Sequence, residues 1–337
     1  MRIGLEPHRF LHRGVKGSVV LALDSKRRCG IVVFAALAVA SFLAAVCATE
    51  ASATTPLELL VRHAPLLVLH RYEPFSPTSV EGFIADSDLL VQAPDGSWQP
   101  SPLPLGRSGA ASRLDQRACR AIDGPAAIGC YASAEAAHGS TPTVYGAVFR
   151  TRERIALQYW LFYPANVFSP TVPTGLFWQS HEGDWEAVSV LLDRRERPLV
   201  IGLSEHCGGA RRTWERAPRR GPHPLVYVAL GSHANYFGPG AKALDRRCWP
   251  TEAVAVFNAY KVPLLDHAGG GRSVLPHVVN VGSAAPAWMA FAGTWGDDQY
   301  VHFPDVDPLR FGAGPRGPAF HSLWRSPVAT VLGWRPG

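Results

Sequence analysis

Short apolar runs separated by turn-forming residues dominate the chain after residue 53. The runs that predict strands are rich in β-branched and aromatic residues and are bounded by Gly, Pro or Asp. They cover residues 65–71, 143–150, 155–163, 185–193, 199–204 and 225–230. A short helix is expected within 79–90. Residues 92–142, rich in Gly, Pro, Ser and Ala, are expected to form loops.

This pattern predicts an all-β fold with minor helices, in which the strands form an antiparallel β-sandwich with long loops. A parallel α/β fold would need crossover helices, and runs of ten or more residues at helical spacing are nearly absent after residue 53. Because no repeat or long low-complexity linker divides residues 54–337, we expect them to form a single β-sandwich domain.

Residues 31–48 form an unbroken apolar run, preceded by Lys-Arg-Arg at 26–28 and followed by Ala-Ser-Ala at 51–53. This order is typical of a secretory signal, so residues 1–53 are predicted to be a signal peptide. The run is slightly short for a membrane span of about 20 residues. The alternative is an uncleaved signal anchor formed by a helix over 31–48. Either way we expect a secreted or cell-surface protein.

The basic charge of the chain is concentrated before residue 54. The formal net charge is +6, but seven Lys or Arg and only three Asp or Glu lie in residues 1–53. About two positive charges therefore remain on the rest of the chain, and nucleic acid is not an expected partner.

Four of the six cysteines follow residue 53, namely Cys119, Cys130, Cys207 and Cys248. Four cysteines allow three pairings. We favour Cys119–Cys130, which closes a short loop containing Gly and Pro, together with Cys207–Cys248. The alternative is four free buried thiols, which is less compatible with export.

The sequence H-E-G-D-W-E, which enters an apolar strand, is the strongest candidate for chemistry. Side chains alternate along a strand, so Asp184 and Glu186 share one face while Trp185 points to the other. A turn or bulge at Gly183 can bring His181 to the carboxylate side.

Two buried carboxylates on one face repel each other, and a divalent cation would neutralise them. Oxygen ligands with a single imidazole suit Ca²⁺ or Mg²⁺ better than zinc. The alternative interpretation is that Asp184 and Glu186 pair with arginines at the rim of a sheet.

Three other polar residues follow predicted strands and are expected to reach the same place. Asn166 ends the aromatic sequence Q-Y-W-L-F-Y-P-A-N, where it could be a cation ligand. His206 lies in E-H-C-G-G, directly after the predicted strand 199–204. His233 lies in G-S-H-A-N-Y after the following strand.

The segment 211–220 carries five arginines around Trp214. On a loop, Arg211, Arg212 and Trp214 could contact anionic headgroups or phosphate-bearing glycans. The alternative is a solvated loop without a ligand.

These motifs, taken in order, resemble the vacuolar-protein-sorting-associated Vps sixty-two family. The similarity rests on Y-W-L-F-Y-P-A-N, H-E-G-D-W-E, E-H-C-G-G and Y-V-A-L-G-S-H-A-N-Y, with F-A-G-T-W-G and G-P-R-G-P near the C-terminus. It covers roughly residues 60–328. More distantly, the chain is similar to the necrosis- and ethylene-inducing-peptide-like proteins, which carry G-H-R-H-D-W-E at the matching place.

The distant resemblance implies a β-sandwich with a divalent cation in an acidic cavity that engages a membrane glycolipid headgroup. It places His181, Asp184 and Glu186 at the cation ligands and Asn166 where those relatives have Asp. His206 and His233 match histidines at the cavity. Glu-Gly replaces the Arg-His of the heptapeptide, and the neutral Asn166 implies weaker or water-mediated cation binding.

The sequence therefore predicts an exported β-sandwich protein that binds a divalent cation and, through it, a polar lipid headgroup or glycan at a cell surface. The expected cation ligands are His181, Asp184, Glu186 and Asn166, and the expected ligand-binding residues are His206, His233, Trp185, Trp214, Arg211 and Arg212. One alternative is a metal-dependent hydrolase with His206 or His233 as general base. A second is a structural surface domain without metal.

Overall fold

The computed structural model describes residues 54–337 except 121, 123, 140, 171–176 and 283. Residue contacts divide the chain into two units, Met1–Ala53 and Thr54–Gly337. The expected signal segment, including the run over 31–48, lies outside the described residues. Among the residues that are described, no helix is long and apolar enough to span a bilayer.

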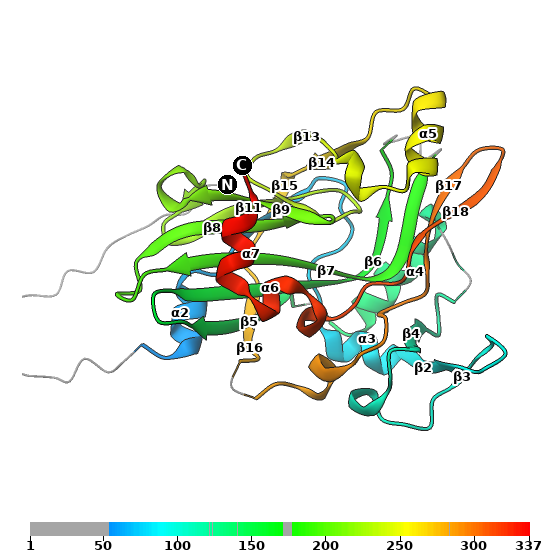
Figure 1. Cartoon of the computed structure of the whole chain (residues 1–337), viewed down its shortest axis with the longest axis horizontal. Coiled ribbons are helices and arrows are strands. Elements are labelled where there is room, and N and C mark those ends of the chain that lie inside the picture. Colours follow the sequence, from blue (N-terminus) through cyan, green and yellow to red (C-terminus); the bar gives the residue numbers. More distant parts are fainter. Residues whose placement is uncertain (1–53, 121, 123, 140, 171–176, 283) are drawn as a thin grey trace, which may run out of the picture. The chain divides into compact units, whose positions relative to one another are not determined.

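The larger sheet of the second unit has nine strands and is built around the long antiparallel pair β6–β7 (Figure 1). The hairpin of β17 and β18 pairs with the start of β7. The order along the main path is β16 (His277–Asn280), β5 (Thr143–Arg150), β6 (Ile155–Phe168), β7 (Trp178–Leu192), β8 (Pro198–Glu205), β9 (Gly208–Thr213) and β19 (Arg335–Pro336), with β17 (Gln299–Phe303) and β18 (Val306–Gly312) beside it.

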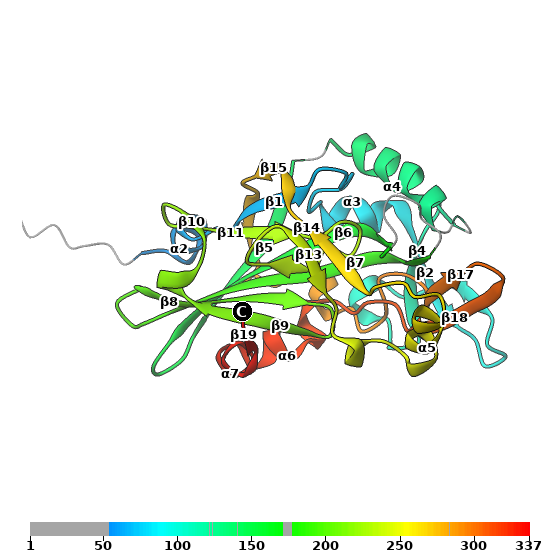
Figure 2. The same ribbon diagram turned by 90° about the horizontal axis from the view of Figure 1, so that it is seen from above.

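A five-stranded sheet packs against the larger one (Figure 2). Side chains from both sheets, such as Leu67 and Val226 from the smaller and Leu157 and Val188 from the larger, are fully buried in one apolar cluster. Two sheets that enclose a common core form a sandwich, so the predicted mainly β fold is confirmed. The strands of the smaller sheet are β10 (Arg219–Arg220), β11 (His223–Val228), β1 (Leu66–His70), β15 (Gly270–Val274) and β12 (Asn235–Tyr236).

Two further small sheets and several short helices surround the sandwich (Figure 1). The small sheets are β3 (Trp98–Pro100), β2 (Ser87–Gln92) and β4 (Ser112–Gln116), and β13 (Gly240–Ala243) with β14 (Leu265–Ala268). The helices are α2 (Pro56–Arg62), α3 (Val80–Asp86), α4 (Pro125–Ala137), α5 (Thr251–Ala259), α6 (Ser322–Arg325) and α7 (Pro327–Gly333). Single 3₁₀ turns are η1 (Leu105–Arg107), η2 (Trp214–Arg216), η3 (Arg246–Cys248), η4 (Ala287–Ala290) and η5 (Pro318–Phe320).

Two details of the predicted architecture are wrong. Residues 92–142 are not only loops: they contain strands and the 13-residue helix α4, which begins at Pro125 after Gly124. Proline is well suited to a first helical position, and the alanines that follow are strong helix formers. The strand pairs β1–β11, β16–β5 and β19–β9 are parallel, so the sandwich is not purely antiparallel.

Both favoured disulfides are confirmed. Cys119 and Cys130 join the segment after β4 to α4, and Cys207 and Cys248 join the β8–β9 turn to η3. Disulfides persist in oxidising compartments, and these two fit an exported protein.

Gly183 lies in the left-handed region with φ 55°, in the middle of β7. A Cβ atom there would lie 2.2 Å from the Trp295 carbonyl oxygen. We predict that Gly183→Ala lowers the free energy of unfolding by at least about 3 kcal/mol in urea titrations, from backbone strain and overpacking together.

Gly96→Ala is the matched control, since Gly96 also has a positive φ, of 86°, but a Cβ there meets open space. Strain alone should cost about 1 kcal/mol. Equal losses for the two variants would show that the approach of Trp295 does not matter.

Candidate functional site

The register of β6 and β7 places the candidate carboxylates as the sequence predicts. Asp184 pairs with Tyr163 and Glu186 pairs with Leu161. Directly opposed residues of an antiparallel pair share a face. Tyr163 and Leu161 belong to the core between the two sheets, whereas Trp185 packs in the aromatic cluster on the other side of the larger sheet.

One cavity of about 260 Å³ collects all four candidate cation ligands. Asn166, His181, Asp184 and Glu186 line it, together with His206 from the end of β8. The strands bring them together: Asn166 pairs directly with His181 across β6 and β7. Of the three strand-end residues expected to reach the same place, Asn166 and His206 line this cavity, whereas His233 is not among its lining residues.

Asn166 and His181 are both oriented in a way that leaves a lone pair available. The Asn166 side-chain oxygen is buried and accepts no hydrogen bond from any described residue. His181 Nδ1 donates to the Gly183 carbonyl oxygen at 2.8 Å. In a neutral imidazole this leaves Nε2 as the acceptor, the arrangement that is usual for histidines that bind metals.

Asp184 already has a cationic partner, which is His233 rather than an arginine. His233 Nδ1 lies 2.8 Å from Asp184 Oδ2, and Nε2 lies 3.4 Å from Glu73 Oε1. Burial lowers the pKa of His233, but the two carboxylates outweigh it and raise the pKa to about 10. His233 is thus a buried imidazolium between two carboxylates.

Several contacts hold this imidazolium in place. Its ring stacks on that of Tyr163 with centroids 3.8 Å apart. The backbone of His233 is left-handed, with φ 52°, and it follows Gly231, whose N–H donates to Glu73 Oε2 at 2.7 Å. Left-handed backbone at a bulky residue costs free energy and persists only where the surroundings enforce it.

Glu186 lacks such a counter-charge. Burial, together with the nearby charge of Asp184, raises the pKa of Glu186 well above its usual range. Ser204 Oγ donates to its carboxyl group from β8. Among the described residues no arginine pairs with Asp184 or Glu186, so the arginine alternative is not what the structure shows.

His206 closes one side of the cavity on the disulfide-linked turn after β8. Its Nε2 lies 2.8 Å from Asp266 Oδ2, and its side chain is 21% exposed. Burial lowers the pKa of His206, but Asp266 outweighs it and the pKa rises. Asp266 also accepts hydrogen bonds from Ser232 and Tyr236. These bonds hold its carboxylate in the position where it contacts His206.

Of the remaining predicted ligand-binding residues, Arg211, Arg212 and Trp214 do not line this cavity. Arg211 donates from Nε to the Trp334 carbonyl oxygen, and Arg212 lies over the ring of Phe237. Trp214 is buried in the core between the sheets. The segment they belong to is not a loop, because it forms β9, η2 and β10. Trp185 lines the cavity, but its ring lies within the aromatic cluster.

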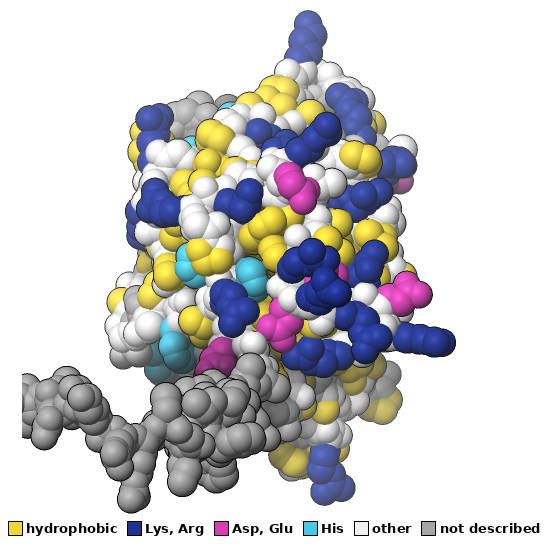
Figure 3. All heavy atoms as spheres, turned by 90° about the vertical axis from the view of Figure 1, so that its left-hand side faces the viewer, with side chains coloured by type: hydrophobic (Ala, Val, Ile, Leu, Met, Phe, Trp, Pro, Cys, Tyr) yellow, Lys and Arg dark blue, Asp and Glu magenta, His cyan; other side chains and the backbone are white. Residues whose placement is uncertain are grey.

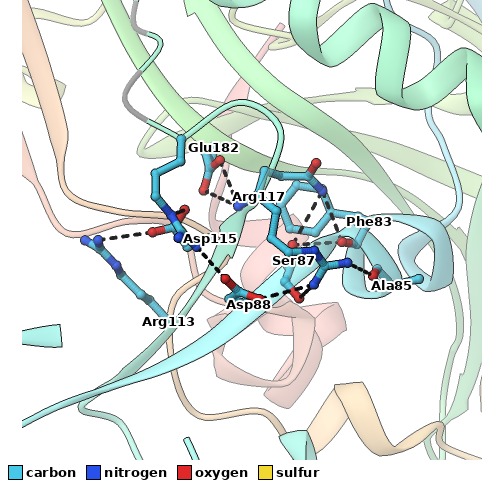
Figure 4. A network of polar contacts seen from close by, with 10 residues as sticks. Phe83, Ala85, Ser87, Asp88, Arg113, Asp115, Arg117 and Glu182 are labelled. Atoms are coloured by element: carbon cyan, nitrogen blue, oxygen red, sulfur yellow. Dashed lines mark hydrogen bonds and ion pairs between the residues drawn. The ribbon is translucent and has the colours of Figure 1, made fainter. Parts of the chain in front are cut away.

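A second cavity, of about 430 Å³, adjoins the first and shares Asn166 and His181 with it. Glu182 lines it and accepts hydrogen bonds from Tyr131 Oη and the Gln116 N–H. Burial raises the pKa of Glu182 to about 7. Arg113 and Asp115, which also line this cavity, form an ion pair, and Arg117 nearby pairs with Asp88 (Figure 4).

Sequence reasoning missed the residues that support the site from a distance in the chain. Glu73, Asp266 and Ser204 each contact a predicted site residue. Glu73 and Asp266 lie outside the motifs that indicated the site, and Ser204, directly before E-H-C-G-G, was not singled out. Glu73 follows β1 and Asp266 lies in β14, so only the fold brings them to β7. The position of Glu73 just after a strand was the available signal, and it is weak.

Among the residues that the structure describes, no three His, Cys, Asp or Glu side chains are grouped closely enough to hold a metal ion by themselves. A cation here would also need the Asn166 amide oxygen, a ligand molecule or water.

We predict that His233→Asn lowers the free energy of unfolding by about 3–5 kcal/mol, because it leaves Asp184 and Glu73 buried without a counter-charge. Asparagine tolerates left-handed backbone, so strain does not explain the loss. Tyr163→Phe is the control: it removes a buried hydroxyl that bonds to no described residue, and stability should change little. Similar losses from both variants, measured by urea unfolding, would contradict the charge argument.

Solved structures similar to this chain include NLPPya in complex with glucosamine, with a TM-score of 0.40 and 14% identity over 82% of this chain and 90% of that chain. Another is the necrosis and ethylene inducing protein 2 from the causal agent of cocoa's witches' broom disease. Its TM-score is 0.32 and its identity 16%, over 72% of this chain and 82% of that chain.

No family model matches the chain. Among curated proteins of Saccharomyces cerevisiae, it is 27% identical over 198 residues to the putative vacuolar protein sorting-associated protein TDA6. It is 26% identical over 216 residues to the vacuolar protein sorting-associated protein 62. The matches cover 50% and 52% of this chain but only 41% and 43% of those relatives. The resemblance to the Vps sixty-two family is thus confirmed, over half of the chain.

Proposed function

We propose that the cavity at Asp184 and Glu186 binds a divalent cation, Ca²⁺ or Mg²⁺, and through it a hydroxyl-rich headgroup of a lipid or glycan at a cell surface. One observation carries this proposal. The side-chain oxygen of Asn166 is buried in the wall of a cavity that Asp184 and Glu186 also line, and it has no hydrogen-bond partner among the described residues. A buried oxygen of this kind costs free energy unless a ligand or water satisfies it.

The donor set suits a hard cation. Asp184, Glu186 and Asn166 offer oxygens, and His181 offers Nε2. Oxygen-rich sets of this kind favour Ca²⁺ or Mg²⁺ over zinc, which prefers four nitrogen or sulfur ligands. Since the protein offers few ligands and His233 already neutralises part of the charge, modest affinity is expected.

The same shortage of protein ligands leaves coordination positions for an outside molecule. Ca²⁺ takes 6–8 oxygen ligands, more than these residues supply. Sugar hydroxyls are suitable oxygen donors, and the amides of Gln179 and Gln299 in the cavity wall can hydrogen-bond to them. The two disulfides agree with a place outside the cell, where such headgroups are accessible.

Binding accounts for the histidines better than hydrolysis does. A general base needs a free lone pair near the substrate. Both ring nitrogens of His233 face carboxylates and the ring is fully buried, while His206 Nε2 faces Asp266. A purely structural domain would leave the unpartnered oxygen of Asn166 unexplained.

We predict that Ca²⁺ or Mg²⁺ raises the thermal unfolding midpoint of the protein relative to EDTA. A ligand that binds only the native state at 100 times its dissociation constant stabilises it by about 2.7 kcal/mol. Glu186→Gln should abolish the shift while leaving the EDTA midpoint nearly unchanged, because the amide mimics the uncharged carboxyl that burial favours. Asp298→Asn, which removes an exposed partner of Arg310, is the control and should keep the full shift.

Asn166→Asp adds a charged ligand and should tighten cation binding about tenfold in calorimetric titrations, since ligand charge sets the affinity of such sites. Binding of the protein to sugar arrays should then require the cation and be lost with Glu186→Gln. An unchanged midpoint for the wild type, or the same shift for wild type and Glu186→Gln, would rule out a cation in this cavity.

A further inference from the structure

The end of the sandwich opposite the cavity is formed by two neighbouring turns. Ile155, at the start of β6, pairs with Arg150 of β5 on one side and with Leu192 of β7 on the other. The β5–β6 turn at 151–154 and the β7–β8 turn at 193–197 therefore lie side by side. Each turn carries three arginines, counting Arg150 with the first.

The helix α2 joins the same end. Arg62, its last residue, lies 3.6 Å from Glu196 of the β7–β8 turn, and Arg150 lies 3.8 Å from the same carboxylate. Thr55 and Glu58 form a reciprocal cap at the start of the helix, so α2 is well defined from its first turn.

The β10–β11 hairpin completes this end. His63, which follows α2, contacts the ring of Trp214 with centroids 5.8 Å apart. His223 Nδ1 donates to the Ala64 carbonyl oxygen at 2.9 Å. Arg219 and Arg220 are thereby held beside α2, whereas Arg211 and Arg212 of the same arginine-rich segment are only partly exposed.

We call this surface the basic end and define it by six exposed arginines: Arg62, Arg152, Arg194, Arg195, Arg219 and Arg220. Seen end-on, basic side chains gather over this face around hydrophobic ones, with few acidic side chains among them (Figure 3). Of the six, only Arg62 forms an ion pair with a described residue. The guanidinium group of Arg219 also lies over the ring of Trp214, 5.2 Å from its centroid. Such stacking leaves the N–H groups at the edge of the guanidinium available to an outside partner.

Two exposed apolar side chains lie within the basic end. Leu57 and Val61, one turn apart on α2, are 45% and 50% exposed. Leu59 and Leu60 on the other side of the helix are fully buried. The helix therefore presents an apolar pair to solvent directly beside Arg62.

We infer that the basic end docks on the surface of an anionic lipid bilayer. Anionic headgroups attract arginines near the surface. An amphipathic surface helix can also place apolar side chains at the boundary between headgroups and acyl chains, where Leu57 and Val61 lose their contact with water. A soluble polyanion would satisfy the arginines but would leave the apolar pair exposed.

Docking by this end leaves the cavity free. Glu186 is the residue of the cavity nearest to this end on β7, and it pairs with Leu161, six residues beyond Ile155 along β6. At the rise of an extended strand this is about 20 Å. The cavity and the docked surface are therefore separate, and docking requires neither the cation nor the ligand of the cavity.

Flotation of the full-length protein with vesicles tests this inference. Vesicles of phosphatidylcholine alone are compared with vesicles that also contain phosphatidylserine, at low and physiological salt. Arg219→Ala combined with Arg220→Ala should lower the preference for anionic vesicles about 30-fold, since each arginine contributes about fivefold. EDTA should have no effect, even if the cation site fails its own test.

Arg246→Ala combined with Arg247→Ala is the matched control, because these adjacent arginines are exposed on η3, which the disulfide holds beside the cavity. The control should keep at least half of the preference. Equal losses from the two double variants, or none from either, would overturn the inference.

Leu57→Ser combined with Val61→Ser distinguishes a bilayer from a soluble polyanion. This variant should weaken binding to anionic vesicles but leave binding to a heparin column unchanged. Two results together would show that the basic end recognises a soluble polyanion instead. The serine variant would bind anionic vesicles as well as the wild type does, and the Arg219 and Arg220 variant would lose binding to heparin. Circular dichroism confirms that each variant is folded.

Discussion

The buried imidazolium of His233 is the interaction on which the site depends. Asp184 and Glu186 line the cavity, and Glu73 and Asp266 are buried near them. Buried carboxylates cost free energy unless a counter-charge or hydrogen bonds compensate them. His233 reaches two of them at once, from a left-handed turn held by Gly231, whose missing side chain lets the backbone approach Val167. The hydrogen bonds, the stacked ring of Tyr163 and the left-handed backbone together hold the His233 ring between Asp184 and Glu73.

This arrangement changes the role of a bound cation. The sequence suggested that repulsion between Asp184 and Glu186 would require a divalent ion. In the structure His233 neutralises Asp184, and the raised pKa of Glu186 favours its uncharged form. His233 thus supplies the counter-charge that the sequence interpretation assigned to an ion, and a cation in the proposed site would act as a ligand that recruits Glu186.

Local pattern was sufficient for most strands, because β-branched and aromatic runs bounded by turn residues specify extended backbone whatever their partners. It did not indicate the partners, so the parallel pairings of β1 and β16 were missed. The motif around Asp184 and the strand ends at Asn166 and His206 identified one cavity correctly. Glu73 and Asp266 could not be found, since their importance comes only from contacts far apart in sequence.

In the arginine-rich segment, closeness in sequence did not predict closeness in space. Sequence proximity groups Arg211 and Arg212 with Arg219 and Arg220, but β9 and β10 belong to different sheets. The first pair packs against Trp334 and Phe237, and the second joins arginines from turns more than twenty residues away. Residues 54–337, which are nearly neutral as a whole, can thus carry a strongly basic surface at one end of their long strands and an acidic cavity toward the other. Net charge does not describe either surface, because each is assembled by strand pairing.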